Sequence, residues 1–239
     1  PGDYIVIPKS TTYRVHVEST PSLFLIVETP VPVELPERGL LGRHALFDLG
    51  VITVPELVPV NGTEKREWEV RIKRAGEYTK VFYPFYPMDV VSWKGDLWAA
   101  KLNVRDFRPI TSHRYHLPPT VHTTFQAGGL LISTFAPRPL ETDPQALRVP
   151  FYHRNTDYDE VLFYHQGDFF SRSGIEPGMF TLHPQGLHHG PQPKAVEASQ
   201  AKTHTDEVAI MIESRQPFTV LPQLETVELK DYATSWSRL

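Results

Sequence analysis

Proline is the feature that most limits what this chain can fold into, because 23 of its 239 residues are proline. That is about twice the usual share. Proline lacks a backbone N–H and clashes with the preceding helical turn, so this density interrupts long helices. The sequence therefore argues against a helical bundle or a coiled coil. Aromatic residues form 11% of the chain, which excludes disorder over its whole length.

Short apolar segments between turn residues indicate strands. They are rich in Val, Ile, Tyr, Phe, Trp and Thr, the residues that favour a pleated and half-buried surface. A short helix is expected at Arg43–Leu49, and the polar stretch 191–206 is expected to form a loop. Short strands at this spacing are typical of an all-β sandwich or barrel. The predicted strands are Asp3–Ile7, Thr12–Val17, Ser22–Glu28, Trp68–Lys73, Val90–Trp93, Leu97–Leu102, Gly129–Phe135, Glu160–His165 and Glu207–Glu213.

Composition excludes several functional classes. The net charge is −4, from 24 basic and 28 acidic residues, whereas a nucleic-acid-binding protein would carry a basic stripe. Cysteine is absent, which excludes disulfides, a thiolate nucleophile and cysteine-ligated metals. No apolar run approaches the ~18 residues that span a bilayer, and no signal peptide opens the chain. We therefore expect a cytoplasmic protein with neither nucleic acid nor membrane as a partner.

Metal-capable side chains concentrate in the second half of the chain, where five of the eleven histidines fall between His153 and His189. His153 precedes a polar turn, Glu160 begins an apolar strand, and His189 follows about thirty residues later. Two imidazoles and one carboxylate on adjacent strands would form a facial triad, which suits non-haem Fe(II) and its oxygen chemistry. The alternative interpretation is a set of ordinary hydrogen-bonded histidines beside a solvated acidic turn, and spacing alone does not separate the two.

Other catalytic patterns are missing from the sequence. A Gly-x-Ser-x-Gly elbow, which would present a serine nucleophile, is not found. The sequence also contains no His-Glu-x-x-His zinc motif and no glycine-rich phosphate loop. These absences leave the histidine-rich region as the main candidate for chemistry.

Three segments resemble homogentisate 1,2-dioxygenase, an iron-dependent family of the cupin superfamily. Phe151–Asn155 is similar to the Tyr-His-Arg-Asn stretch of the family. Leu182-His183, followed six residues later by His189-Gly190-Pro191, matches the step and the ending of a second family motif. Val90–Gly95 with Ala99–Lys101 resembles a third motif. The resemblance runs from Pro1 to about Ser214.

This resemblance implies a fold and an activity. The fold would be an all-β bicupin of two jelly-roll-like barrels, with 1–108 as the remainder of an incomplete first barrel and 109–239 as the barrel with the iron site. The activity would be ring cleavage of homogentisate or a related hydroquinone acid by dioxygen, with Fe(II) as cofactor and a maleylacetoacetate-type product. The family also forms oligomers, so a homo-oligomer is expected. Two alternatives are a metal-binding cupin without this activity, such as a sensor or structural paralogue, and a Zn or Mn cupin isomerase.

The resemblance also assigns the metal ligands. It makes His153 and His189 ligands and supplies a carboxylate ligand six residues after the first histidine, where this chain has Asp159. Glu160 lies one residue later and begins the apolar strand, as the glutamate of the family does. We therefore expect Glu160 to be the ligand, since successive side chains of a strand point to opposite faces and only one of the two can face the metal.

Further roles follow from the same motifs. His183 matches a histidine that contacts the substrate hydroxyl, and its alternative interpretation is a hydrogen-bonded structural residue. His116 is the best match to the catalytic base, with His113 and His122 as competitors. The family has a substrate-binding tyrosine near the position of Phe169, and we expect Tyr164 to supply the missing hydroxyl.

Overall fold

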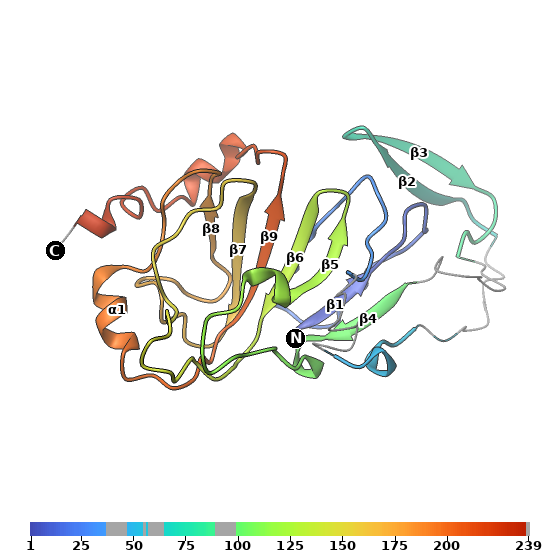
Figure 1. Cartoon of the computed structure of the whole chain (residues 1–239). Coiled ribbons are helices and arrows are strands. Elements are labelled where there is room, and N and C mark those ends of the chain that lie inside the picture. The colour runs from blue at the N-terminus through green and yellow to red at the C-terminus, as the bar shows by residue number, and fades with distance from the viewer. Residues whose placement is uncertain (37–46, 55, 57–64, 89–98, 238–239) are drawn as a thin grey trace.

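A computed structural model describes residues 1–36, 47–54, 56, 65–88 and 99–237. The described chain is mostly β-structure with one short α-helix, α1, over Pro193–Ser199 (Figure 1). Single 3₁₀ turns lie at Leu49–Val51, Val104–Asp106, Pro119–His122, Pro222–Thr226 and Ser235–Ser237. Among the described residues, every helix is too short to span a bilayer. The strands are β1 (Asp3–Val6), β2 (Trp68–Arg74), β3 (Glu77–Tyr83), β4 (Ala100–Asn103), β5 (Thr123–Ala127), β6 (Leu130–Phe135), β7 (Asp159–Gln166), β8 (Phe180–His183) and β9 (Val208–Ser214).

The strands form three antiparallel sheets in the described residues. The largest has five strands in the order β5-β6-β9-β7-β8, while β1 pairs with β4 and β2 pairs with β3. The described chain is therefore mostly β, which is compatible with the predicted all-β class. None of these three sheets closes on itself, so the arrangement as two jelly-roll barrels stays a prediction.

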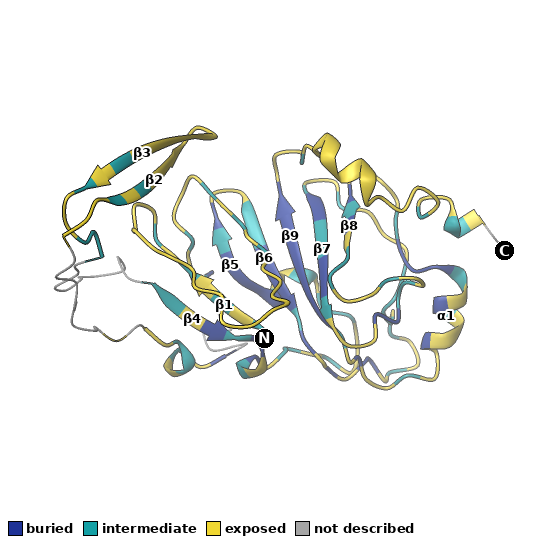
Figure 2. Cartoon of the chain, turned by 180° about the vertical axis from the view of Figure 1, so that it is seen from behind, coloured by how far each residue is buried: buried dark blue, intermediate teal, exposed yellow. Residues whose placement is uncertain are grey.

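One face of the five-stranded sheet carries the main apolar core. Ile132, Phe163 and Ile212 on this face pack with Leu102 and Phe107 from the N-terminal part of the chain. Burying such side chains contributes about 1.5–3 kcal/mol each. Strand β9, in the middle of the sheet, is buried along its whole length (Figure 2). The two predicted domains, 1–108 and 109–239, therefore share one core on this face.

The opposite face of the same sheet carries titratable side chains. Glu160 of β7 pairs in register with His183 of β8 and with Glu213 of β9. Because side chains alternate along a strand, these three residues point to one face, opposite to the apolar core. Further along this face, Tyr164 packs with Phe169 in a second apolar cluster. One face of the sheet therefore carries the apolar core that joins the two halves of the chain. The other face carries a row of polar side chains that could bind a metal.

Several predicted elements differ from the structure. Thr12–Val17 and Ser22–Glu28 form no strand; their alternating apolar residues have no partner strand, and Tyr13 and Ile26 are 61% and 83% exposed. The predicted loop 191–206 contains α1, which begins at Pro193, where proline is favoured because the first helical N–H needs no partner. Val90–Trp93 and most of Arg43–Leu49 lie outside the described residues.

Candidate metal centre

Two histidines and one glutamate meet at the polar face of the five-stranded sheet. His153, Glu160 and His189 each place one ligand-type atom within 4.8 Å of the others. Glu160 lies near the start of β7, His153 precedes that strand, and His189 follows β8. The local fold thus gathers two imidazoles and a carboxylate from three separate segments of the chain.

The backbone joins the two histidine segments directly. His153 and His189 form an isolated antiparallel bridge in which each N–H donates to the other's carbonyl at 2.9 Å. The side chains repeat one pattern: Nδ1 of His153 lies 3.2 Å from the carbonyl of Phe151, and Nδ1 of His189 lies 3.0 Å from that of Leu187. A carbonyl only accepts, so in both rings Nδ1 carries the proton and Nε2 keeps its lone pair. Such a hydrogen bond is what orients a metal-binding imidazole.

The carboxylate of Glu160 lies close to three nitrogen-bearing side chains. Its Oε2 is 3.2 Å from Nε2 of His189 and 3.3 Å from Nδ1 of His183, and its Oε1 accepts from Nδ2 of Asn155 at 3.0 Å. Burial by itself raises the pKa of Glu160, but the hydrogen bonds that its carboxylate accepts, first from His183 and then from Asn155, oppose this effect, and the pKa is held well below its usual range. Glu160 is therefore ionised at neutral pH.

The arrangement fits a cation. Nε2 of His189 is buried and has no hydrogen-bond partner in the part of the chain that the structure describes, although the Glu160 carboxylate lies 3.2 Å away. With its proton on Nδ1, the ring presents a lone pair to an acceptor-only carboxylate, which is unfavourable unless a positive charge lies between them. Two nitrogen donors and one carboxylate are the donor set of a facial triad.

A second carboxylate borders the site. Nδ2 of Asn155 also approaches Oε1 of Glu213 at 3.4 Å, and Oγ of Ser133 lies 3.5 Å from Oε2 of Glu213. Burial, together with the nearby charge of Glu160, raises the pKa of Glu213 to about 7. Asn155 therefore links an ionised carboxylate to one that is partly protonated at neutral pH.

Asp159, the competing carboxylate, is engaged elsewhere. Its Oδ1 accepts from the backbone N–H of Gln185 and its Oδ2 from that of Phe218, both at 2.8 Å. Asp159 lies on the opposite face of β7 from Glu160, as expected for adjacent strand residues. The structure places Glu160, and not Asp159, beside the two histidines.

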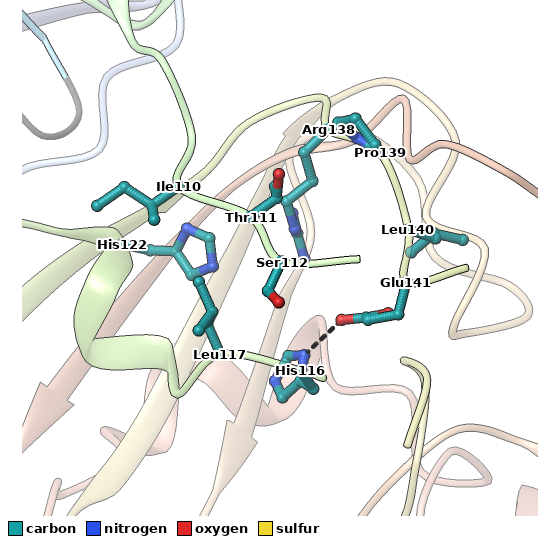
Figure 3. A pocket seen from close by; sticks show the side chains of 10 residues that line it. All are labelled: Ile110, Thr111, Ser112, His116, Leu117, His122, Arg138, Pro139, Leu140 and Glu141. Atoms are coloured by element: carbon teal, nitrogen blue, oxygen red, sulfur yellow. Dashed lines mark hydrogen bonds and ion pairs between the residues drawn. The ribbon is translucent and has the colours of Figure 1, made fainter. Parts of the chain in front are cut away.

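His116 lies at one wall of a small pocket (Figure 3). Its Nδ1 is 3.2 Å from Oε1 of Glu141, and its ring contacts Phe151, which in turn contacts the ring of His153. His122 lines the same pocket and is 3% exposed, with its ring beside Phe135. His113 is exposed at the surface. Of the three candidate bases, His116 is the one that the ring of Phe151 connects to His153.

The two aromatic residues expected near the substrate are both buried. The Tyr164 hydroxyl is 3.1 Å from Oγ1 of Thr181, and burial raises its pKa to about 12. The ring of Phe169 packs edge-on against that of Tyr164, with centroids 4.9 Å apart. Their roles toward a substrate stay predictions.

Sequence reasoning overlooked the groups that surround the candidate ligands. Asn155 lies in the Tyr-His-Arg-Asn stretch, but nothing in the sequence indicates that its amide contacts two carboxylates. Glu213 has a signal in the sequence, since it is a charged residue at the end of the apolar run Val208–Ile212. Glu141 lies in an irregular segment and has no comparable signal.

Comparison with known proteins covers almost the whole chain. Residues 1–104 match the family model described as homogentisate 1,2-dioxygenase N-terminal, and residues 116–239 match the one described as homogentisate 1,2-dioxygenase C-terminal. A Saccharolobus solfataricus protein named "putative dioxygenase" is 38% identical over 98% of this chain and 62% of its own length. Homogentisate 1,2-dioxygenases of Rhodopseudomonas palustris and Bradyrhizobium diazoefficiens are each 29% identical over 100% of this chain and 56% of their length. The chain thus spans somewhat more than half of these relatives.

Proposed function

The chain belongs to the homogentisate 1,2-dioxygenase family, and we propose that it carries the metal centre of an iron-dependent enzyme. In this proposal the enzyme uses dioxygen to open the ring of homogentisate or a related hydroquinone acid, which gives a maleylacetoacetate-type product. The observation that carries the proposal is the meeting of His153, Glu160 and His189 within 4.8 Å, in the part of the chain that matches the C-terminal model.

The three residues have the donor types that iron of this class needs. Fe(II) held by two imidazoles and one carboxylate would act as a Lewis acid and as a template for an electron-rich ring and dioxygen. The carbonyls of Phe151 and Leu187 fix the histidine rings so that Nε2 is the donor atom. The ionised Glu160 would supply the negative charge.

His116 and His183 are the proposed catalytic histidines. Burial lowers the pKa of both rings, so each is neutral at pH 7. In each ring Nδ1 faces a glutamate carboxylate, which leaves Nε2 as an acceptor for a phenolic proton. We assign His116 as the base and His183, with Tyr164, as contacts to the substrate.

The wider architecture belongs to the same proposal. Matches to separate N-terminal and C-terminal models support a two-unit bicupin. Homo-oligomerisation and a cytoplasmic location are proposed on the resemblance to the family alone.

Oxygen uptake by the Fe(II)-loaded protein tests this function. With homogentisate, we expect consumption of one dioxygen per substrate and appearance of a ring-opened product. Zn(II)-loaded protein is the matched control and should consume no oxygen. Protein that binds Fe(II) but consumes no oxygen with homogentisate, gentisate or hydroquinone would contradict the proposal and favour a metal-binding paralogue. Turnover of a substrate without dioxygen by Zn- or Mn-loaded protein would favour an isomerase.

A further inference from the structure

The pocket lined by His116 contains a second pair of imidazole and carboxylate groups. Nδ1 of His116 lies 3.2 Å from Oε1 of Glu141, and Figure 3 shows the two side chains facing each other. The side chains are 19% and 9% exposed. From this contact, we propose that Glu141 is a positioning residue that holds the proton of His116 on Nδ1 and so keeps Nε2 free as the proton acceptor. This inference rests on the proposed function, in which His116 is the base.

The backbone holds both partners in place. The carbonyl of His113 accepts hydrogen bonds from the N–H groups of Thr142 and Asp143, at 3.1 and 2.9 Å. These bonds tie the segment before His116 to the segment after Glu141. On the other side of Glu141, the N–H of Leu140 donates to the carbonyl of Thr203 at 2.8 Å. The carboxylate is therefore fixed relative to the ring without help from a ligand.

The chemistry of the pair selects one tautomer. An ionised carboxylate only accepts hydrogen bonds, so the ring nitrogen that faces it must carry a proton. For a neutral ring, the other nitrogen then has a lone pair. In the proposed step, the substrate O–H bond breaks, the oxygen keeps the electron pair, and Nε2 of His116 takes the proton. The resulting imidazolium still donates from Nδ1 to Glu141, which stabilises its charge.

The surroundings of the pair suit this role. The ring of His116 contacts Phe151 edge-on at 5.0 Å between centroids, and Phe151 contacts His153 at 5.5 Å. Oε2 of Glu141 is buried and has no hydrogen-bond partner among the described residues, so the carboxylate is not committed to another group there. Arg138 lines the same pocket and opposes a positive charge on His116, whereas Glu141 favours it.

The pH dependence of catalysis tests the inference. A glutamine at position 141 can present either its oxygen or its amide to Nδ1, so it no longer forces the tautomer and no longer carries charge. For Glu141→Gln, we expect kcat to fall about 10- to 100-fold. The acid limb of kcat/KM should move to lower pH by about one unit, because loss of the carboxylate lowers the pKa of the base. Glu141→Asp should recover part of the rate.

Two controls separate this role from a structural one. Asp143→Asn alters a carboxylate of the same segment that instead accepts from the N–H of Gln145, and it should leave the rate and the pH limb unchanged. A Glu141→Gln variant that loses thermal stability but keeps the position of the acid limb would overturn the inference.

Nitrogen NMR of the histidine rings in the zinc-loaded protein gives a readout that needs no turnover. We expect His116 of the unaltered protein to carry its proton on Nδ1, and this preference should weaken in Glu141→Gln. A proton on Nε2 in the unaltered protein would refute the positioning role. If His116 carries its proton on Nδ1 but the Fe(II)-loaded protein takes up no oxygen, the proposed function is refuted and the positioning role is not.

Discussion

His153 and His189 are bound to each other through their backbones, by two hydrogen bonds of 2.9 Å that run in opposite directions. Their rings lie 4.4 Å apart between centroids. Each Nδ1 is also held by the carbonyl two residues earlier in the chain. Neither ring can turn without breaking one of these bonds. The two nitrogen donors of the candidate metal centre are therefore placed before any metal binds, which lowers the entropic cost of binding.

Removal of any candidate ligand should therefore weaken metal binding strongly. For His153→Ala, Glu160→Ala and His189→Ala, we expect the affinity for Fe(II) or its surrogate Zn(II) to fall by more than about 100-fold, since altering groups outside the ligand set costs 10- to 100-fold. Metal content after dialysis measures the effect, and circular dichroism checks that each variant is folded. Full metal content in all three variants would show that the metal lies elsewhere.

Asp159→Asn is the matched control for Glu160. Asp159 accepts two backbone N–H groups, from Gln185 and Phe218, and it does not face the histidines. We expect this variant to keep its metal and to lose about 1–3 kcal/mol of the free energy of unfolding, because an amide cannot accept from both N–H groups. Loss of metal in Asp159→Asn with retention in Glu160→Ala would reverse the ligand assignment.

His183→Gln should affect the metal indirectly. His183 donates from Nδ1 to Oε2 of Glu160 at 3.3 Å, so it orients the carboxylate. We expect metal affinity to fall about 10- to 100-fold, less than for the ligand variants. Competition with a chelator of known affinity measures this difference. His165→Gln, on the opposite face of β7, is the control, and an equal loss in both variants would contradict a specific role for His183.

The raised pKa of Glu213 predicts that stability depends on pH. Its pKa is about 7 in the folded protein against the ordinary value of 4.5, so the folded state holds this proton at pH values where the unfolded chain has released it. The contribution of Glu213 is fully present below about pH 4.5 and is lost as the pH rises to about 7. The loss amounts to about 3 kcal/mol at most.

Glu213→Gln should remove that pH dependence. We expect the free energy of unfolding of the metal-free variant to change less between pH 4.5 and 7 than that of the unaltered protein. Urea titrations at several pH values, with chelator present, measure it. Glu176→Gln, at an exposed position, should behave like the unaltered protein. Identical slopes for Glu213→Gln and the unaltered protein would show that Glu213 is not buried beside Glu160.

Sequence predicts some of the paired strands, but it misses β3 and β5, which also pair, and it predicts segments that find no partner. Glu160–His165 and Glu207–Glu213 match β7 and β9 to within one residue at each end, because these segments are apolar and flanked by turn residues. Ser22–Glu28 is similarly apolar but pairs with no strand. Pairing depends on residues far away in the sequence, which composition does not reveal.

In the candidate metal centre, too, some features could be predicted from the sequence and others could not. The residues that resemble a known motif, His153, Glu160 and His189, could be predicted and lie together. The groups that orient the two histidine rings could not, because they are backbone carbonyls. Glu141, which contacts His116, could not be predicted either, because the two residues come close only in the folded chain. Every residue has a backbone carbonyl, so no sequence pattern marks the one that accepts a hydrogen bond from Nδ1.

Tyr164 allows a test of the substrate contacts. Its hydroxyl lies 3.1 Å from Oγ1 of Thr181, and the residue is 3% exposed. If the hydroxyl turns to a substrate, Tyr164→Phe should raise KM for homogentisate about 5-fold or more and leave the metal content unchanged. Thr181→Val removes the partner but keeps the tyrosine hydroxyl. We expect both variants to lose about 1 kcal/mol of stability, and only Tyr164→Phe to raise KM.

The neighbouring Phe169 completes this test. Its ring packs against Tyr164 in a buried cluster, so Phe169→Tyr adds a second hydroxyl beside that of Tyr164. If that hydroxyl reaches the substrate, KM for homogentisate should fall and the ranking against gentisate and hydroquinone should change. If it stays among the apolar side chains, the variant should instead lose about 1–3 kcal/mol of stability with KM unchanged. Parallel measurements of KM and urea unfolding distinguish these results, and an unchanged KM would place Phe169 outside the substrate pocket.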